Sequence, residues 1–95
     1  MRYEIMFIVR PDIDGENLKE VIKSFEKVLI DQKAKIDSSK EFGQKELAYE
    51  IKGYKNGYYY LYEISCKDDK AQKEFDRLAL LSEDIIRHII IKLEK

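Results

Sequence analysis

The sequence predicts an α+β fold in which two helices pack on one face of a four-stranded antiparallel sheet. Apolar residues alternate with polar ones in residues 3–9, 47–51 and 58–64, which is the period of a strand. They recur every three or four residues in 18–29 and 71–79, which is the period of a helix. A chain of 95 residues leaves room for one domain only, residues 1–95.

The first strand and the first helix are the clearest elements. Tyr3 to Val9 forms a strand with one strongly apolar face, and Pro11 ends it. Asp14 is placed to cap a helix that is expected to end near Lys33. The inner stripe of this helix consists of Leu18, Val21, Ile22, Phe25, Val28 and Leu29.

The middle of the chain is predicted to form a long hairpin. Residues 36–41 alternate but are mostly polar, which is typical of a strand at the edge of a sheet. Gly43 interrupts the pattern and indicates a bulge or a bend. Asn56-Gly57 predicts a tight turn, because this pair accepts the positive φ angles of two-residue hairpin loops. Residues 58–65 then return as the third strand.

A second helix and a fourth strand complete the chain. Asp68 or Asp69 can cap the helix, Ser82-Glu83-Asp84 ends it, and residues 85–93 are rich in β-branched side chains. The order βαββαβ predicts the ferredoxin-like arrangement, with the second face of the sheet left open. The residues expected beneath the helices are Tyr3, Ile5, Phe7, Val9, Leu47, Tyr49, Ile51, Ile64, Ile89 and Ile91.

The direction of the tyrosines in the third strand follows from its polar end. Glu63 and Ser65 belong in water, so Ile64 is expected to face the helices, and alternation sends Tyr58, Tyr60 and Tyr62 to the same side. An apolar centre is left on the open face, formed by Met6, Ile8, Tyr59, Leu61, His88 and Ile90. Arg2, Glu4 and Lys92 are expected at its edges. We interpret this face as a docking surface, and the alternative is a sheet face without a partner.

Composition narrows the range of functions. Charged residues make up 39% of the chain, yet the formal net charge is −1, which argues against a strong nucleic-acid binder that acts alone. Cys66 is the only cysteine, so the chain contains no disulfide. No apolar run approaches the length of a membrane span, and the N-terminus is too charged for a signal peptide, so we expect a cytoplasmic protein.

Catalytic and metal-binding patterns are absent from the sequence. His88 is the single histidine, Cys66 has no metal-ligand spacing to it, and the glycines form no phosphate loop. The aromatic run resembles the RNA-recognition motif, but that motif needs Tyr58 and Tyr60 on the open face, where alternation does not place them. A ferredoxin-like domain that binds a small ligand, or regulates by associating with itself through the open face, stays an alternative.

A more specific resemblance covers nearly the whole chain. The segment 43–52, GQKELAYEIK, resembles the signature of the bacterial small-ribosomal-subunit protein six family, in which a glycine and a basic residue precede Leu-Ala-Tyr-x-Ile. Met1-Arg2-Tyr3-Glu4, Pro11, Gly57-Tyr58 and Ile85-Ile86-Arg87-His88 are also similar to family positions at family spacing. The chain departs from the family at Lys33-Ala34, where many members have glycine, and it ends at Lys95 without the longer tail of some members.

The resemblance implies a structural protein of the small subunit, with no enzymatic activity and no cofactor, metal, membrane or small-molecule substrate. It implies binding to the central domain of 16S rRNA as a heterodimer with small-subunit ribosomal protein eighteen, a small basic partner. We expect the partner to dock on Met6, Ile8, Tyr59, Leu61, His88 and Ile90 and along the edge of the second strand. We expect RNA phosphate and sugar contacts at Arg2, Lys52, Lys55, Arg87 and Lys92.

Overall fold

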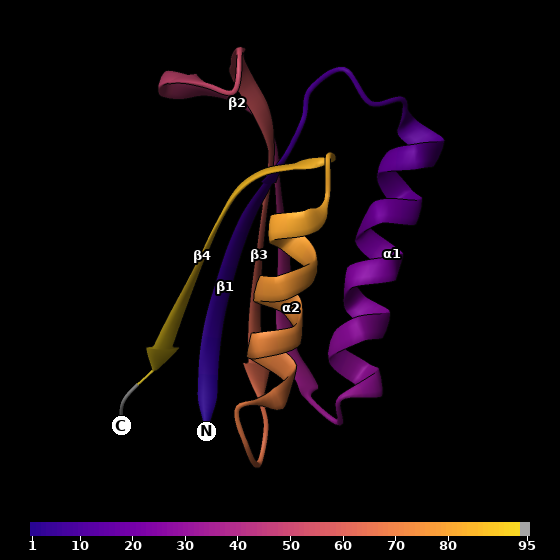
Figure 1. Cartoon of the computed structure of the whole chain (residues 1–95), viewed down its shortest axis with the longest axis vertical. Helices are drawn as coiled ribbons and strands as arrows, with labels where there is room; N and C mark the ends of the chain where they lie inside the picture. The colour runs from indigo at the N-terminus through magenta and orange to yellow at the C-terminus, as the bar shows by residue number, and fades with distance from the viewer. Residues whose placement is uncertain (94–95) are drawn as a thin grey trace.

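The computed structural model, which describes residues 1–93, has the predicted ferredoxin-like order. The elements are β1 Arg2–Val9, α1 Gly15–Asp31, β2 Lys35–Ile51, β3 Tyr54–Ser65, α2 Lys70–Leu81 and β4 Ile85–Leu93. The strands form one antiparallel sheet in the order β2-β3-β1-β4, and both helices cover the same side of it (Figure 1). Within residues 1–93 no helix is long and apolar enough to cross a membrane. The end of the chain at Lys95 lies outside the described residues.

The ends of α1 follow from local chemistry. The Asp14 carboxylate accepts the backbone N–H of Asn17 at 2.9 Å, which confirms the predicted cap. At the other end Lys33 adopts a φ of +66°, where glycine is the usual residue, and the N–H of Ala34 reaches the carbonyl of Leu29. The helix therefore ends without the glycine that the resemblance implies, and Lys33 adopts the left-handed backbone conformation, which is unfavourable for a residue with a side chain.

The core lies between the sheet and the helices and is rich in aromatic rings. Phe7 of β1 is fully buried at its centre, in contact with Phe25 of α1, Phe75 of α2, and Tyr60 and Tyr62 of β3. The centroid of its ring lies 5.5–6.1 Å from each of the other four, the spacing of favourable aromatic pairs. The prediction that Tyr58, Tyr60 and Tyr62 point into the core or to its rim is confirmed, since Tyr60 and Tyr62 are buried and Tyr58 packs against the core at its rim.

The hairpin turn is not at Asn56-Gly57, so that prediction is wrong. Ile51 pairs with Tyr54, which leaves Lys52 and Gly53 as the two-residue loop, and both have positive φ, +52° and +84°. Asn56 and Gly57 lie inside β3, opposite Glu46 and Lys45. A tight approach between strands, and no turn, explains the glycine at position 57.

Gly57 lies directly against β1. A Cβ atom at this position would stand 2.4 Å from Cγ2 of Ile8 and 2.9 Å from the backbone oxygen of Val9. Both distances are below ordinary van der Waals contact, and the Val9 oxygen belongs to the paired strand, so it cannot move without disturbing the ladder. We therefore expect Gly57→Ala to lower the free energy of unfolding by about 1–3 kcal/mol, through overpacking.

Urea unfolding of the two proteins measures this change. The matched control is Gly15→Ala, because a Cβ at Gly15 meets nothing within 4 Å and the position opens α1. The control is expected to be neutral or slightly stabilising, since alanine favours the helix. Equal stability of Gly57→Ala and the wild type would contradict the close approach.

The far half of the hairpin leaves the core. Gly43 has a φ of +77°, the register of β2 against β3 shifts between Glu41 and Gly43, and it shifts again between Glu46 and Ile51. These breaks confirm the bend predicted at Gly43, and the tip of the hairpin turns toward the open side of the sheet, away from the helices (Figure 1). The prediction that Leu47, Tyr49 and Ile51 lie beneath the helices is wrong because of this bend.

The faces of β4 are also reversed relative to the prediction. The ladder with β1 carries an extra residue, because Ile8 pairs with Arg87 whereas Val9 pairs with Ile85. His88 and Ile90 lie opposite Phe7 and Ile5 and face the helices, so neither belongs to the open face where it was expected. Ile89 and Ile91, expected beneath the helices, lie on the open face instead, and Ile91 is 49% exposed.

Candidate protein and RNA interface

Four of the six predicted docking residues lie together on the open face. Met6 pairs with Leu61 and Ile8 pairs with Tyr59 across β1 and β3, so their side chains form two adjacent rows on the side away from the helices. Met6, Tyr59 and Leu61 are half-buried. Ile8 is only 4% exposed, although it faces away from the helices, because the tip of the hairpin covers it.

The hairpin tip and the sheet enclose an apolar groove, which we call the open-face groove. Its volume is about 260 Å³. The lining residues are Met6 and Ile8 of β1, Leu47, Ala48, Tyr49 and Ile51 of β2, Tyr59 of β3, and Arg87 and Ile89 of β4. Arg87 is the one charged residue among them. An apolar hollow with a single polar group at its border is the form of a binding site for a side chain of another molecule.

Sequence reasoning missed half of this groove. Leu47, Tyr49 and Ile51 were placed in the core, and Ile89 was placed on the wrong face of β4. Alternation alone could not find them, because their position depends on the bend at Gly43 and on the bulge in β4. The positive-φ preference of glycine at position 43 was the one signal that pointed toward the bend.

The five predicted RNA-binding residues divide between two ends of the sheet. Lys52 and Lys55 are exposed at the hairpin tip, and Arg87, which borders the open-face groove, lies at the same end. Arg2 and Lys92 lie at the other end, about 20 Å away along the strands. Arg2 donates to Glu63 at 3.3 Å on the open face, whereas Lys92 is opposite Tyr3 and on the helix side of β4.

The side chain of His88 packs against α2 and helps to hold the fold together. Its Nε2 atom lies 2.7 Å from Oδ1 of Asp76 in α2, and its ring packs on Phe75, with centroids 6.3 Å apart. The side chain therefore links β4 to α2 on the helix side of the sheet. Within residues 1–93 no group of three or more His, Cys, Asp or Glu side chains is arranged so that it could hold a metal ion.

Two buried tyrosines carry altered acidity. Tyr62 donates its hydroxyl to Oε2 of Glu26 at 2.8 Å, and burial together with this carboxylate raises the pKa of Tyr62. Burial and the neighbouring Glu41 raise the pKa of Tyr60 to about 12. Both phenols therefore stay neutral above the pH at which an ordinary tyrosine ionises, and Tyr62 links β3 to α1.

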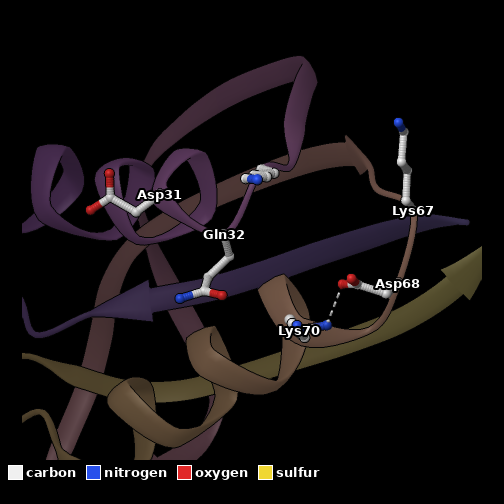
Figure 2. A pocket seen from close by; sticks show the side chains of 6 residues that line it. Asp31, Gln32, Lys67, Asp68 and Lys70 are labelled. Carbon is white, nitrogen blue, oxygen red and sulfur yellow. Dashed lines mark hydrogen bonds between the residues drawn. The ribbon is translucent and has the colours of Figure 1, made fainter.

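A further hollow lies at the opposite end from the hairpin tip, between the end of α1 and the loop before α2. Figure 2 shows that its lining side chains come from Asp31 and Gln32 on one side and from Lys67, Asp68 and Lys70 on the other. The Asp68 carboxylate accepts a hydrogen bond from the backbone N–H of Lys70 at 3.0 Å, so one of the free N–H groups at the start of α2 has a partner. Lys33 completes the lining, which therefore contains three lysines and two aspartates, so most of the positive charge has a carboxylate nearby.

Comparisons with known proteins agree with the geometry. The family model of ribosomal protein S6 matches residues 2–92. The small ribosomal subunit protein bS6 of Lactiplantibacillus plantarum is 42% identical over 93 residues, which cover 98% of this chain and 94% of that protein. The crystal structure of the 30S ribosomal protein S6 from Thermotoga maritima superposes with a TM-score of 0.91 at 28% identity, covering 97% of this chain and 86% of that chain.

Proposed function

Because the chain belongs to the ribosomal protein S6 family, a structural and non-enzymatic family of the small ribosomal subunit, we propose that it binds the central domain of 16S rRNA together with small-subunit ribosomal protein eighteen. In this proposal the partner fills the open-face groove, which Met6 and Tyr59 line, and covers Leu61 beside it. A nearly neutral chain gains RNA affinity by joining a basic partner, since phosphate contacts need an excess of positive charge. The complex then acts in the ribosome.

The observation that carries the proposal is the groove itself. It places six aliphatic residues and two tyrosine rings around one hollow on the face that the helices leave uncovered. A buried aromatic residue at the centre of such a surface commonly supplies much of the binding free energy. We therefore assign Tyr59 as the anchor for the protein partner.

The basic residues act at the border of the complex. Lys52, Lys55 and Arg87 gather at the hairpin end, next to the groove, so the partner and the RNA meet there in our proposal. Arg2 and Lys92 give a second, more distant contact with phosphates. Contacts of this type position a protein on RNA without reading the sequence.

Binding measurements with and without the partner test the proposal. A fragment of the 16S central domain is titrated with this chain alone, with the partner alone, and with both, over a range of salt concentrations. We expect tight binding only with both proteins, weakening steeply as salt rises. Tight binding by this chain alone, or a stable homodimer without RNA binding in any combination, would contradict the proposal, and the second result would favour a self-associating domain.

The anchor is tested separately. Tyr59→Ala is expected to weaken heterodimer formation more than tenfold, which corresponds to about 2 kcal/mol. Leu80→Ala is the control, because it also truncates an apolar side chain but lies on α2, on the helix side of the molecule, and is 70% exposed. Calorimetric titration of the partner gives both affinities. An unchanged affinity for Tyr59→Ala would remove the open-face groove from the interface.

A further inference from the structure

We propose that Tyr49 is a base-stacking residue: its ring receives one unpaired base of the RNA, and Lys52 and Lys55 hold the adjoining phosphates. This inference rests on the proposed function, because it concerns the RNA that the heterodimer binds. It adds a residue that contacts a base to a set that otherwise contains phosphate contacts only.

The exposure of Tyr49 is the first observation. Its side chain is 66% exposed, which makes it the most exposed aromatic residue in positions 1–93. The ring contacts among aromatic residues 1–93 do not include Tyr49, whereas Tyr60 and Tyr62 of the next strand are buried in them. A large ring held in water contributes little to the core, so its face is accessible to another molecule.

A bulge in β2 holds the ring of Tyr49 away from the sheet. Glu46 pairs with Asn56 and Ile51 pairs with Tyr54, so the four residues 47–50 of β2 face the single residue Lys55 of β3. The surplus residues bulge away from the ladder and carry Tyr49 to the crest of the hairpin. Because Lys55 lies directly opposite and Lys52 lies in the turn, the ring and the two ammonium groups belong to the same tip.

The two sides of the crest differ in chemistry. On the inner side Tyr49 borders the open-face groove, whose other lining residues are aliphatic apart from Tyr59 and Arg87. On the outer side it borders a second, open hollow of about 490 Å³. That outer hollow is lined by Glu46, Leu47, Tyr49, Glu50, Lys55 and Asn56.

The outer hollow fits a nucleobase better than an apolar side chain of a protein. A base offers a π-face to the tyrosine, and its amino and imino groups can donate to the carboxylates of Glu46 and Glu50 or to the amide of Asn56. The same carboxylates repel phosphate, which places the backbone of the RNA at Lys52 and Lys55. Within residues 1–93 these two lysines form no salt bridge, so their charges are available to phosphates.

The test uses the heterodimer at saturating partner concentration and the 16S central-domain fragment. We expect Tyr49→Ala and Tyr49→Leu to weaken RNA binding about 5- to 150-fold, the range for loss of one stacked base, and Tyr49→Phe to bind within twofold of the wild type. The slope of affinity against salt stays unchanged in Tyr49→Ala, because stacking releases no counterions. In Lys52→Gln with Lys55→Gln that slope falls by about 2, one for each phosphate contact.

Phe42→Ala is the matched control, because Phe42 is another exposed aromatic residue of β2 but lies outside both hollows. Its RNA affinity is expected to stay within twofold of the wild type. Because Tyr49 also borders the groove that the partner fills, heterodimer formation is measured separately for each variant. The proposal is overturned if the saturated Tyr49→Ala heterodimer binds RNA within twofold of the wild type, because Tyr49 would then contact the protein partner alone. If the wild-type heterodimer does not bind the fragment at all, the proposed function fails as well.

Discussion

Phe7→Ala is expected to lower the free energy of unfolding by about 3–5 kcal/mol, the range for loss of a fully buried phenylalanine. Phe7 is completely buried and its ring contacts four other aromatic rings, which come from both helices and from β3. The rigid sheet cannot close over the vacated space, so the cavity persists and adds to the loss of burial. For a domain of this size the melting temperature should fall by about 12–40 °C.

Thermal and urea unfolding followed by circular dichroism measure this effect. Phe42→Ala makes the same chemical change at a side chain that is 44% exposed, with the ammonium group of Lys45 5.1 Å from the ring centroid. The control should lose about 1 kcal/mol or less, since an exposed cation–π contact is weak. Similar losses in the two variants would mean that Phe7 does not lie at the centre of the core.

The residues that the sequence placed correctly lie in regular parts of the sheet. In β1 and β3 the ladder is unbroken from Arg2–Ser65 to Val9–Tyr58, so alternation decides the face of every side chain. For this reason Tyr60 and Tyr62 were predicted inside, and Met6, Ile8, Tyr59 and Leu61 were predicted on the open face. The order of the elements, the edge position of β2 and the cap at Asp14 follow from similarly local patterns.

The errors arise where a ladder gains or loses a residue. The extra residue between Ile85 and Arg87 inverts the face of everything that follows in β4, because a slip of one residue exchanges the two sides of a strand. His88 and Ile90 were misplaced for that reason. A bulge of this kind depends on the partner strand, so the sequence of β4 alone contains no sign of it.

Two glycines, Gly53 and Gly57, could each have formed the turn of the hairpin. Asn56-Gly57 has the stronger intrinsic preference for a tight turn, yet the chain turns at Lys52-Gly53 and accepts a left-handed lysine there. Gly57 is fixed elsewhere by its contact with Ile8, which requires a residue without a side chain inside the sheet. Packing between β3 and β1 therefore outweighs the local preference, and this shift creates the overhang that forms the open-face groove.

The stability of the protein should fall steeply between about pH 10 and pH 12. In the unfolded chain Tyr60 and Tyr62 titrate near pH 10, whereas in the folded chain burial and neighbouring carboxylates raise the pKa of both, that of Tyr60 to about 12. Below pH 10 both phenols are neutral in the folded and in the unfolded chain, so the two tyrosines contribute their full stabilisation to the folded state. Above pH 10 the unfolded chain releases protons that the folded chain retains, so each tyrosine lowers the free energy of unfolding by at most about 1.4 kcal/mol per pH unit.

Tyr62 should account for much of this fall, because an ionised Tyr62 would place two negative oxygens 2.8 Å apart in a largely buried position beside Glu26. Urea unfolding at pH 8, 10 and 11.5 measures the effect in the wild type and in Tyr62→Phe. Phenylalanine keeps the ring in the core and has no proton to lose, so the variant should be less sensitive to alkaline pH, although it starts about 1 kcal/mol less stable for want of the hydrogen bond. Tyr49→Phe is the control, because it removes the same hydroxyl from a ring that is 66% exposed and outside the core, and the alkaline fall should match that of the wild type. Equal slopes in the wild type and in Tyr62→Phe would show that the link between Tyr62 and Glu26 does not couple folding to pH.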